Sequence, residues 1–304
     1  MEQFELNILG CGSALPTTKH FPSTQVINLR NKLYMIDCGE GAQIQFRNMS
    51  LNFNRLNHIF LSHLHGDHCF GLPGLLSTLN LLGKTGEIVV HAQPDAEKVF
   101  RPMLNYFCAN MTYSVRFNSI SPFGNELIFE DKSLKVYSIP LKHRVPTCGF
   151  LFEEQPKLSH IIRDAVDFYQ IPVKQLNDIK QGADFITPEG EVVPNSRLTR
   201  SATPPKKYAY CSDTAYSEKI IPIIEGVDLL YHEATFCEED LRRAKETEHS
   251  SAKQAAMIAS KANVKKLIIG HFSARYPNVN VLLREAREIF PETIAAKEQL
   301  KLMV

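Results

Sequence analysis

The segment Ser62–His68 holds the strongest concentration of metal-binding side chains in this sequence. It reads Ser-His-Leu-His-Gly-Asp-His and directly follows the apolar run His58–Leu61. Imidazole nitrogens and carboxylate oxygens suit zinc, and a catalytic zinc site keeps one position open for water. In extended backbone His63 and His65 point to one side, while a turn at Gly66 directs the next aspartate and histidine to a neighbouring point. We therefore predict that this segment supplies ligands to two metal ions.

Two metal sites need more ligands than this segment supplies, and three further candidates lie at the ends of predicted strands. His143 follows the apolar run Lys135–Ile139, Asp213 follows Tyr208–Cys211, and His271 follows Leu267–Ile269. The ends of strands in an α/β sheet are where side chains reach a cleft. A single histidine after a strand is more often an ordinary hydrogen-bonded residue. The interpretation of these three residues as ligands therefore depends on the Ser62–His68 cluster.

Short β-branched runs alternate with longer helical patterns, which predicts an α/β fold. In addition to the three runs above, the predicted strands are Phe4–Leu9, Thr24–Leu29, Leu33–Ile36, His58–Leu61, Ile88–His91, Leu127–Phe129 and Leu229–His232. The predicted helices are Leu72–Leu82, Asp95–Asn105 and, approximately, Ser217–Ile224, Ser250–Ala262 and Val279–Ile289. The stretch Glu153–Lys207 interrupts this alternation, contains six of the 17 prolines, and is predicted to be an inserted arm.

Composition sets broad limits on the class of protein. The chain has 304 residues, 44% of them hydrophobic, which is enough for a large core. Its net charge of +1 indicates no particular partner.

The longest uncharged run in the first third, about Cys69–Gly83, is short and contains proline and glycine, so we predict no membrane span. The N-terminus lacks the basic start of a secretory signal, and the seven cysteines are scattered. We expect a cytoplasmic protein with reduced, mostly buried cysteines.

The motifs resemble those of a known family. His-Leu-His-Gly-Asp-His resembles the signature of the metallo-β-lactamase superfamily. Together with GCGSALPT near the N-terminus, the motifs DCGEGAQIQF (Asp37–Phe46), SHLHGDHCFGLPGLL (Ser62–Leu76), YCSDT (Tyr210–Thr214), HEATF (His232–Phe236) and HFSARY (His271–Tyr276) resemble ribonuclease Z. The resemblance spans nearly the whole chain. It implies an αββα sandwich forming a single hydrolase domain over residues 1–304, with residues 153–207 as an arm that binds tRNA.

The resemblance also implies a dinuclear zinc centre and roles for its residues. One zinc would be held by His63, His65 and His143, the second by Asp67, His68 and His271, and Asp213 would bridge them. Asp67 would also accept a proton, and His249 would donate one to the leaving 3′ oxygen, unless His249 is only a residue at a helix start. Glu233 would hydrogen-bond to a metal ligand and orient it without binding the metal, or would be purely structural.

The implied activity is endonucleolytic removal of the 3′ trailer from precursor tRNA, by a homodimer. Lys174, Lys180, Arg197, Arg200, Lys206 and Lys207 are candidates for phosphate contacts, or form a solvated basic surface. The family's Gly-Pro pair is replaced within Ile171–Leu176, and the Leu15–Leu29 region is less basic than in relatives that discriminate against mature CCA ends. His20, His58, His91 and His160 lie outside the motifs and are expected to be ordinary residues.

Two other functions remain open at this point. The same centre can serve a general phosphodiesterase, an exoribonuclease or an arylsulfatase-like hydrolase, since one fold hosts many reactions. A non-catalytic RNA-binding scaffold built on a decayed hydrolase is the other alternative. Decay normally removes ligands, because an unfilled site leaves buried polar groups unpaired. All seven ligand positions are present, which favours an enzyme; zinc suits them best, and manganese remains an alternative.

Overall fold

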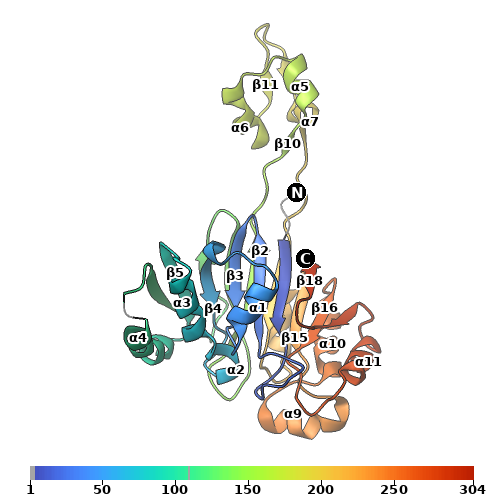
Figure 1. Ribbon diagram of the computed structural model, residues 1–304. Coiled ribbons are helices and arrows are strands. Elements are labelled where there is room, and N and C mark those ends of the chain that lie inside the picture. The colour runs from blue at the N-terminus through green and yellow to red at the C-terminus, as the bar shows by residue number, and fades with distance from the viewer. Residues whose placement is uncertain (1–3, 109) are drawn as a thin grey trace. The chain divides into compact units, whose positions relative to one another are not determined.

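Two large β-sheets form the body of the chain in the computed structural model, which describes residues 4–108 and 110–304 (Figure 1). In spatial order the first sheet contains β18 (Lys301–Met303), β1 (Phe4–Gly10), β2 (Thr24–Leu29), β3 (Lys32–Ile36), β4 (Leu56–Phe60), β5 (Glu87–Ala92) and β6 (Ser114–Ser119). The second contains β17 (Thr293–Ala295), β16 (Leu267–Gly270), β15 (Leu229–Glu233), β14 (Lys207–Cys211), β9 (Cys148–Glu154), β8 (Leu134–Pro140) and β7 (Leu127–Glu130).

The two sheets pack face to face through large apolar side chains. The ring of Phe60 on β4 lies 5.6 Å from that of Phe150 and 5.4 Å from that of Phe152, both on β9. Leu6 and Ile8 of β1 belong to the same buried cluster. Strands covered on both faces are apolar along most of their length, which explains the continuous runs in the sequence.

Helices cover the outer faces of both sheets (Figure 1). The elements beside the first sheet are η1 (Phe53–Arg55), α1 (Ala42–Asn48), α2 (Gly66–Cys69), α3 (Leu72–Leu81) and α4 (Asp95–Phe107). Those of the second half are η3 (Glu218–Ile220), α8 (Ile221–Ile224), η4 (Glu238–Asp240), α9 (Leu241–Thr247), α10 (Ala252–Lys261) and α11 (Asn280–Arg287). Phe46, Leu75 and Phe100 of the first group share one buried cluster with Met35 and Ile59 of the first sheet. The αββα fold class predicted from the sequence is confirmed.

Predicted and observed elements differ in several places. The expected helix Ser250–Ala262 begins at Ala252, because Ser251 and Gln254 form a reciprocal capping box. The expected helix Ser217–Ile224 is a 3₁₀ turn followed by a single α turn. In the two large sheets, strands β6, β9, β17 and β18 were not predicted. β9 directly precedes the expected insertion, and its apolar part is short and fully buried.

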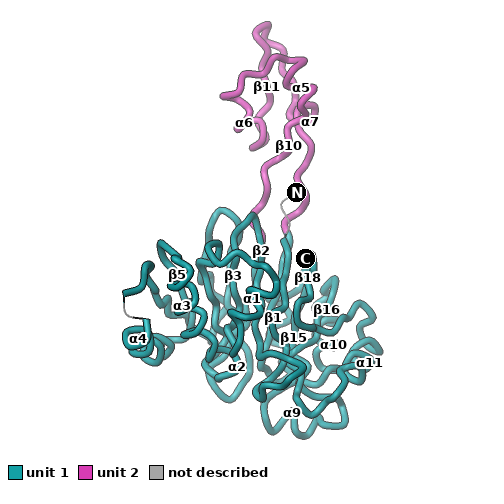
Figure 2. Tube along the Cα trace, in the orientation of Figure 1, with its two compact units in different colours: residues 1–153, 206–304 teal, residues 154–205 magenta. Residues whose placement is uncertain are grey.

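Residues Glu154–Pro205 form a separate compact unit (Figure 2). Its elements are β10 (His160–Ile161), α5 (Arg163–Phe168), η2 (Val173–Gln175), α6 (Leu176–Lys180), β11 (Phe185–Ile186), β12 (Val192–Val193), α7 (Asn195–Leu198) and β13 (Thr199–Arg200). Six buried apolar residues, including Ile179 and Leu198, give it a small core of its own. Glu153 and Lys207 lie outside this unit, because they are ladder partners in β9 and β14.

Two further expectations can be compared with the structure. In the described residues, no helix has both the length and the apolarity needed to cross a membrane. All seven cysteines are free and buried, as expected from their scattered positions.

Candidate metal centre

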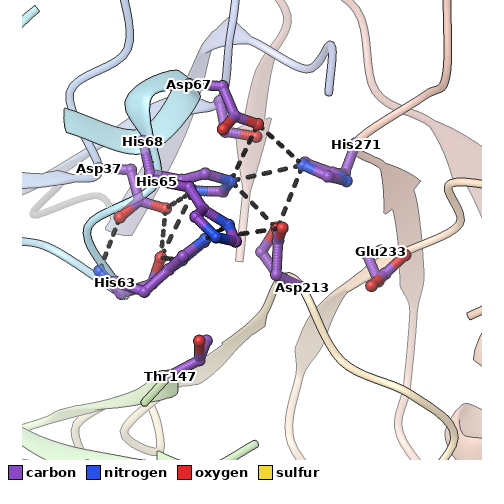
Figure 3. A network of polar contacts seen from close by, with 12 residues as sticks. Asp37, His63, His65, Asp67, His68, Thr147, Asp213, Glu233 and His271 are labelled. Carbon is purple, nitrogen blue, oxygen red and sulfur yellow. Dashed lines mark hydrogen bonds and ion pairs between the residues drawn. The ribbon is translucent and has the colours of Figure 1, made fainter. Parts of the chain in front are cut away.

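Parallel strands bring distant segments of the sequence to one edge of the second sheet. β14, β15 and β16 are parallel neighbours, so the residues that follow them emerge at the same end. Asp213 follows β14 by two residues and His271 follows β16 directly. Glu233 is the last residue of β15. The Ser62–His68 segment follows β4 of the other sheet, and Figure 3 shows its His63, His65, Asp67 and His68 beside Asp213 and His271.

Three histidines and Asp213 converge in a first donor group, of which Figure 3 labels His63, His65 and Asp213. His63 Nε2 lies 3.0 Å from His65 Nδ1, and His143 Nε2 lies 3.4 Å from the same atom. Asp213 Oδ2 lies 3.7 Å from His63 Nε2 and 3.8 Å from His143 Nε2. Four donor atoms thus surround one point.

A second donor group lies on the other side of Asp213. Its members are Asp67, His68 and His271. The Nε2 atoms of the two histidines are 3.3 Å apart, and each lies 3.4 Å from Asp67 Oδ2. Asp213 Oδ1 lies 3.1 Å from both nitrogens. The two carboxylate oxygens of Asp213 therefore face different groups.

The outward ring nitrogens of four histidines have hydrogen-bond partners, which turns the inward nitrogens toward the donor groups. His68 Nδ1 lies 2.7 Å from Asp37 Oδ2, and His271 Nδ1 lies 2.8 Å from Thr235 Oγ1. The remaining partners are the Ser62 hydroxyl for His63 Nδ1 (3.1 Å) and the Glu248 carbonyl for His143 Nδ1 (3.0 Å). Such outer contacts are typical of metal-ligating histidines.

The donor set fits divalent cations. Tetrahedral bonds of about 2.0–2.2 Å to nitrogen and oxygen place neighbouring ligand atoms about 3.3–3.5 Å apart, close to the separations seen here. Burial lowers the pKa of His63, His65 and His143, so these imidazoles are neutral, which is the form that binds metal. Burial opposes a charge on His68 as well, but the Asp213 and Asp67 carboxylates raise its pKa well above the usual range. The carboxylates thus favour positive charge in this group.

Glu233 and His249 form a buried pair beside the donor groups. Glu233 Oε1 lies 2.8 Å from His249 Nδ1, and it accepts a hydrogen bond of 2.7 Å from the Thr214 backbone N–H. Glu233 Oε2 accepts a 2.5 Å bond from the Thr235 hydroxyl. Burial disfavours the charged form of His249, but the Glu233 carboxylate outweighs it and raises the pKa of His249 to about 9. The ring of His249 lies 5.0 Å from that of His143 and 5.4 Å from that of His271.

The structure thus brings together every residue that the sequence analysis selected for this site. It adds two residues to which that analysis assigned no role, Asp37 and Thr235. Both lie in motifs noted in the sequence, but their partners are distant and no spacing rule links them. Asp37, Asp213 and His271 have positive φ angles of 55°, 51° and 59°. Strained backbone of this kind at non-glycine residues is concentrated at functional sites.

Two pockets lie beside the centre. A pocket of about 420 Å³ is bordered by His65, Asp67, Phe70 and Arg144, among others. A pocket of about 690 Å³ on another side is bordered by His143, Arg144, Lys142, Lys219 and Phe123, among others. The rings of Phe70 and Phe123 are largely exposed. Arg144 borders both pockets, so they lie on two sides of this residue.

Comparison with known proteins places this fold and site in a class. A family model described as "Anti-Pycsar protein Apyc1" matches residues 4–97. Among solved structures, the metallo-β-lactamase fold protein YhfI from Bacillus subtilis matches with a TM-score of 0.68 at 16% identity, covering 100% of each chain. Human tRNase Z, short form, matches with a TM-score of 0.69 at 23% identity, covering 98% of each chain. The architecture is therefore the metallo-β-lactamase fold, and its donor groups imply a divalent metal.

The curated relatives identify the family within this class. Ribonuclease Z of Parabacteroides distasonis is 62% identical over 304 residues, covering 100% of both chains. The chain belongs to the ribonuclease Z family.

Proposed function

We propose that this chain is a zinc-dependent endoribonuclease that cuts the 3′ trailer from precursor tRNA, leaving a 3′-OH on the tRNA and a 5′-phosphate on the trailer. The observation that carries the proposal is the pair of donor groups joined by Asp213, in a chain 62% identical to a ribonuclease Z along its whole length. A phosphodiester is a suitable substrate, because its hydrolysis requires both an activated water and neutralisation of negative charge.

The ligands divide between two zinc ions per subunit. One ion would be held by His63, His65 and His143, and the other by Asp67, His68 and His271. One oxygen of Asp213 faces each group. When bound, such a pair supplies an acidified water and positive charge that stabilises the transition state of an in-line displacement. The predominance of imidazole favours zinc over manganese.

Asp67 combines ligation with proton acceptance. Its Oδ2 atom lies 3.4 Å from His68 Nε2 and from His271 Nε2, and the residue also borders the pocket of about 420 Å³. A carboxylate placed between the ligands and an open pocket can orient the attacking water and take up its proton.

His249 donates a proton to the leaving 3′ oxygen. It is not one of the seven proposed ligands, yet its ring lies 5.0 Å from that of His143 and 5.4 Å from that of His271. Glu233 fixes the ring from the buried side through Nδ1. The opposite ring nitrogen, Nε2, is therefore the atom that we assign to proton donation.

The two pockets accommodate the RNA strand on either side of the cut. Lys142, Arg144 and Lys219 provide positive charge for phosphates. Phe70 and Phe123 present exposed rings on which unpaired bases can stack, a contact that every base can make. Recognition of this kind is tolerant of trailer sequence.

The 154–205 unit binds the body of the tRNA. Lys174, Lys180, Arg197 and Arg200 lie in this unit and can contact phosphates. Lys206 and Lys207 are poorer candidates, because their ammonium groups pair with Asp228 at 2.8 Å and with Glu153 at 2.5 Å. We therefore assign the phosphate contacts to the first four residues.

A homodimer is supported by an apolar surface on two helices that contact each other, α3 and α4. The exposed apolar side chains there are Leu81, Leu82, Val99, Met103, Tyr106 and Phe107. Such a group on the surface marks an association site. The dimer itself, and the cytoplasmic location, stay predictions.

The deciding experiment compares a 3′-extended precursor tRNA with an unstructured RNA of equal length. Each is incubated with the protein, with the chelated protein, and with the chelated protein after zinc is restored. A single zinc-dependent cut at the acceptor-stem junction, in the precursor alone, is the expected result. Stepwise shortening of both RNAs would instead identify an exoribonuclease. Hydrolysis of small esters without RNA cleavage would identify another hydrolase, and binding without any hydrolysis would identify a scaffold.

A further inference from the structure

Cys11, His20 and Glu298 form a second cluster of metal-competent side chains, which shares no residue with the centre described above. Cys11 follows β1 directly, His20 lies in the loop between β1 and β2, and Glu298 precedes β18. The three residues therefore come from three segments, and the last lies 278 positions after His20.

The distances between their donor atoms match those in a tetrahedral zinc site. Cys11 Sγ lies 3.5 Å from His20 Nδ1 and 3.6 Å from Glu298 Oε1, and those two atoms lie 3.3 Å apart. Zinc bonds of about 2.3 Å to sulfur and about 2.0–2.2 Å to nitrogen and oxygen, at tetrahedral angles, give edges of roughly 3.3–3.6 Å. Thiolate, imidazole and carboxylate are all established zinc ligands.

Hydrogen bonds that involve the backbone hold His20 and Glu298 in place. The Thr17 hydroxyl accepts a 2.9 Å bond from the His20 N–H, and the Phe21 N–H donates a 3.0 Å bond to Glu298 Oε1. Beside Glu298, the Gln299 N–H donates to the Ile8 carbonyl at 2.9 Å. The arrangement is thus built by both loop and strand.

The environment suits a cation with one exchangeable position. Cys11 is fully buried, while the side chains of His20 and Glu298 are 24% and 15% exposed, so water can reach the cluster from their side. Burial, reinforced by the Glu298 carboxylate, raises the pKa of the Cys11 thiol. The thiol is therefore protonated before binding, and metal uptake releases that proton to solvent as the metal–sulfur bond forms.

We propose that Cys11, His20 and Glu298 bind one zinc ion, with water as the fourth ligand, in addition to the ions of the metal centre. This ion fastens the loop after β1 to the segment before β18. The Phe272 N–H donates a 2.9 Å bond to the Cys11 carbonyl, and Phe272 directly follows His271. The site therefore also braces the segment that carries a ligand of the metal centre, without touching substrate.

Cobalt substitution tests this site separately from the metal centre. The proposed ligands of the metal centre are histidines and aspartates, so absorption from a thiolate–cobalt bond reports only the Cys11 cluster. The protein is stripped of metal, reconstituted with Co²⁺, and its near-ultraviolet charge-transfer absorption is recorded. Zinc per chain is measured on the protein reconstituted with Zn²⁺. In the cobalt protein, we expect the thiolate band in the wild type and its loss in Cys11→Ser. In the zinc protein, we expect three zinc ions per chain in the wild type and two in Cys11→Ser.

Two further variants distinguish loss of the metal site from misfolding. Cys108→Ser changes another buried cysteine, which belongs to the cluster beneath the outer helices, and should keep both the band and the third ion. Glu298→Gln preserves the acceptor for the Phe21 N–H but removes the charge, and should weaken cobalt binding at least tenfold with an unchanged far-ultraviolet circular dichroism spectrum. Absence of the band in reconstituted wild type, or its persistence in Cys11→Ser, would show that the three side chains only hydrogen-bond to one another.

Discussion

The carboxylate of Glu233 lies 2.8 Å from Nδ1 of His249, and Glu233 is closed to solvent. The same carboxylate binds the Thr214 N–H and the Thr235 hydroxyl, which connects it to the neighbours of Asp213 and to His271. We therefore propose that Glu233 is a positioning residue for both the proposed metal ligands and the proposed proton donor.

Glu233→Gln should reduce kcat for precursor tRNA by roughly 10–100-fold, the usual loss when a contact behind a metal site is altered. The amide keeps the shape of the side chain but removes the charge that orients His249. Steady-state kinetics and metal content measure the two effects. Glu225→Gln, at an exposed position, serves as the control. An unchanged kcat in Glu233→Gln would restrict Glu233 to a role in folding.

Asp67→Ala and His249→Ala should impair cleavage of precursor tRNA in different ways. Asp67→Ala should abolish cleavage far more than it weakens tRNA binding, because Asp67 is both ligand and proton acceptor in the proposal. His249→Ala should slow the chemical step about 10²–10⁴-fold while metal content stays intact. Single-turnover cleavage, equilibrium tRNA binding and metal analysis distinguish the two. Full activity in either variant would mean that its role is misassigned.

Removing the 154–205 unit should separate tRNA processing from hydrolysis itself. Glu153 and Lys207 are ladder partners, so replacing residues 154–206 with Asn-Gly closes β9 and β14 into a two-residue hairpin. The shortened protein should hydrolyse a small phosphodiester such as bis(p-nitrophenyl) phosphate at close to the normal rate, and should lose precursor tRNA cleavage. Equal loss of both activities would indicate that the unit is needed for folding.

Acid should destabilise the protein partly through half-buried His58 and buried His91, which are not among the proposed metal ligands. Burial lowers the pKa of His58 to about 4 and that of His91 to about 3. Between about pH 6.5 and these values the unfolded chain binds more protons than the folded one. The contribution of these two histidines to the free energy of unfolding is therefore fully present above about pH 6.5. It is lost as the pH falls toward about 4 for His58 and about 3 for His91.

Urea unfolding at several pH values tests this. His91→Gln should give a shallower fall in the free energy of unfolding with decreasing pH. His160→Gln, at an exposed position, should leave the slope unchanged. Equal slopes for the wild type and His91→Gln would contradict the assignment.

Local sequence was sufficient for the features whose causes are local. The Ser62–His68 segment identified the centre, because its four donors lie within one turn-forming stretch. Most core strands were predicted, because apolar side chains must be buried on both faces. β9 was missed because it borders the insertion, whereas the approximate helix Ser250–Ala262 agrees with α10, whose cap residues are Ser251 and Ala262.

Tertiary structure decided what depends on contacts between distant residues. The sequence with its family resemblance proposed both ligand sets, but only the packing of β14, β15 and β16 placed Asp213 with one oxygen toward each group. The same packing joined Glu233 to His249 and Asp37 to His68. His20 was expected to be an ordinary residue, because it lies outside the motifs. Its contacts with Cys11 and Glu298 appear only in the tertiary structure. The sequence determines the side-chain types directly, whereas the register of the strands and the path of the loops determine the distances between them.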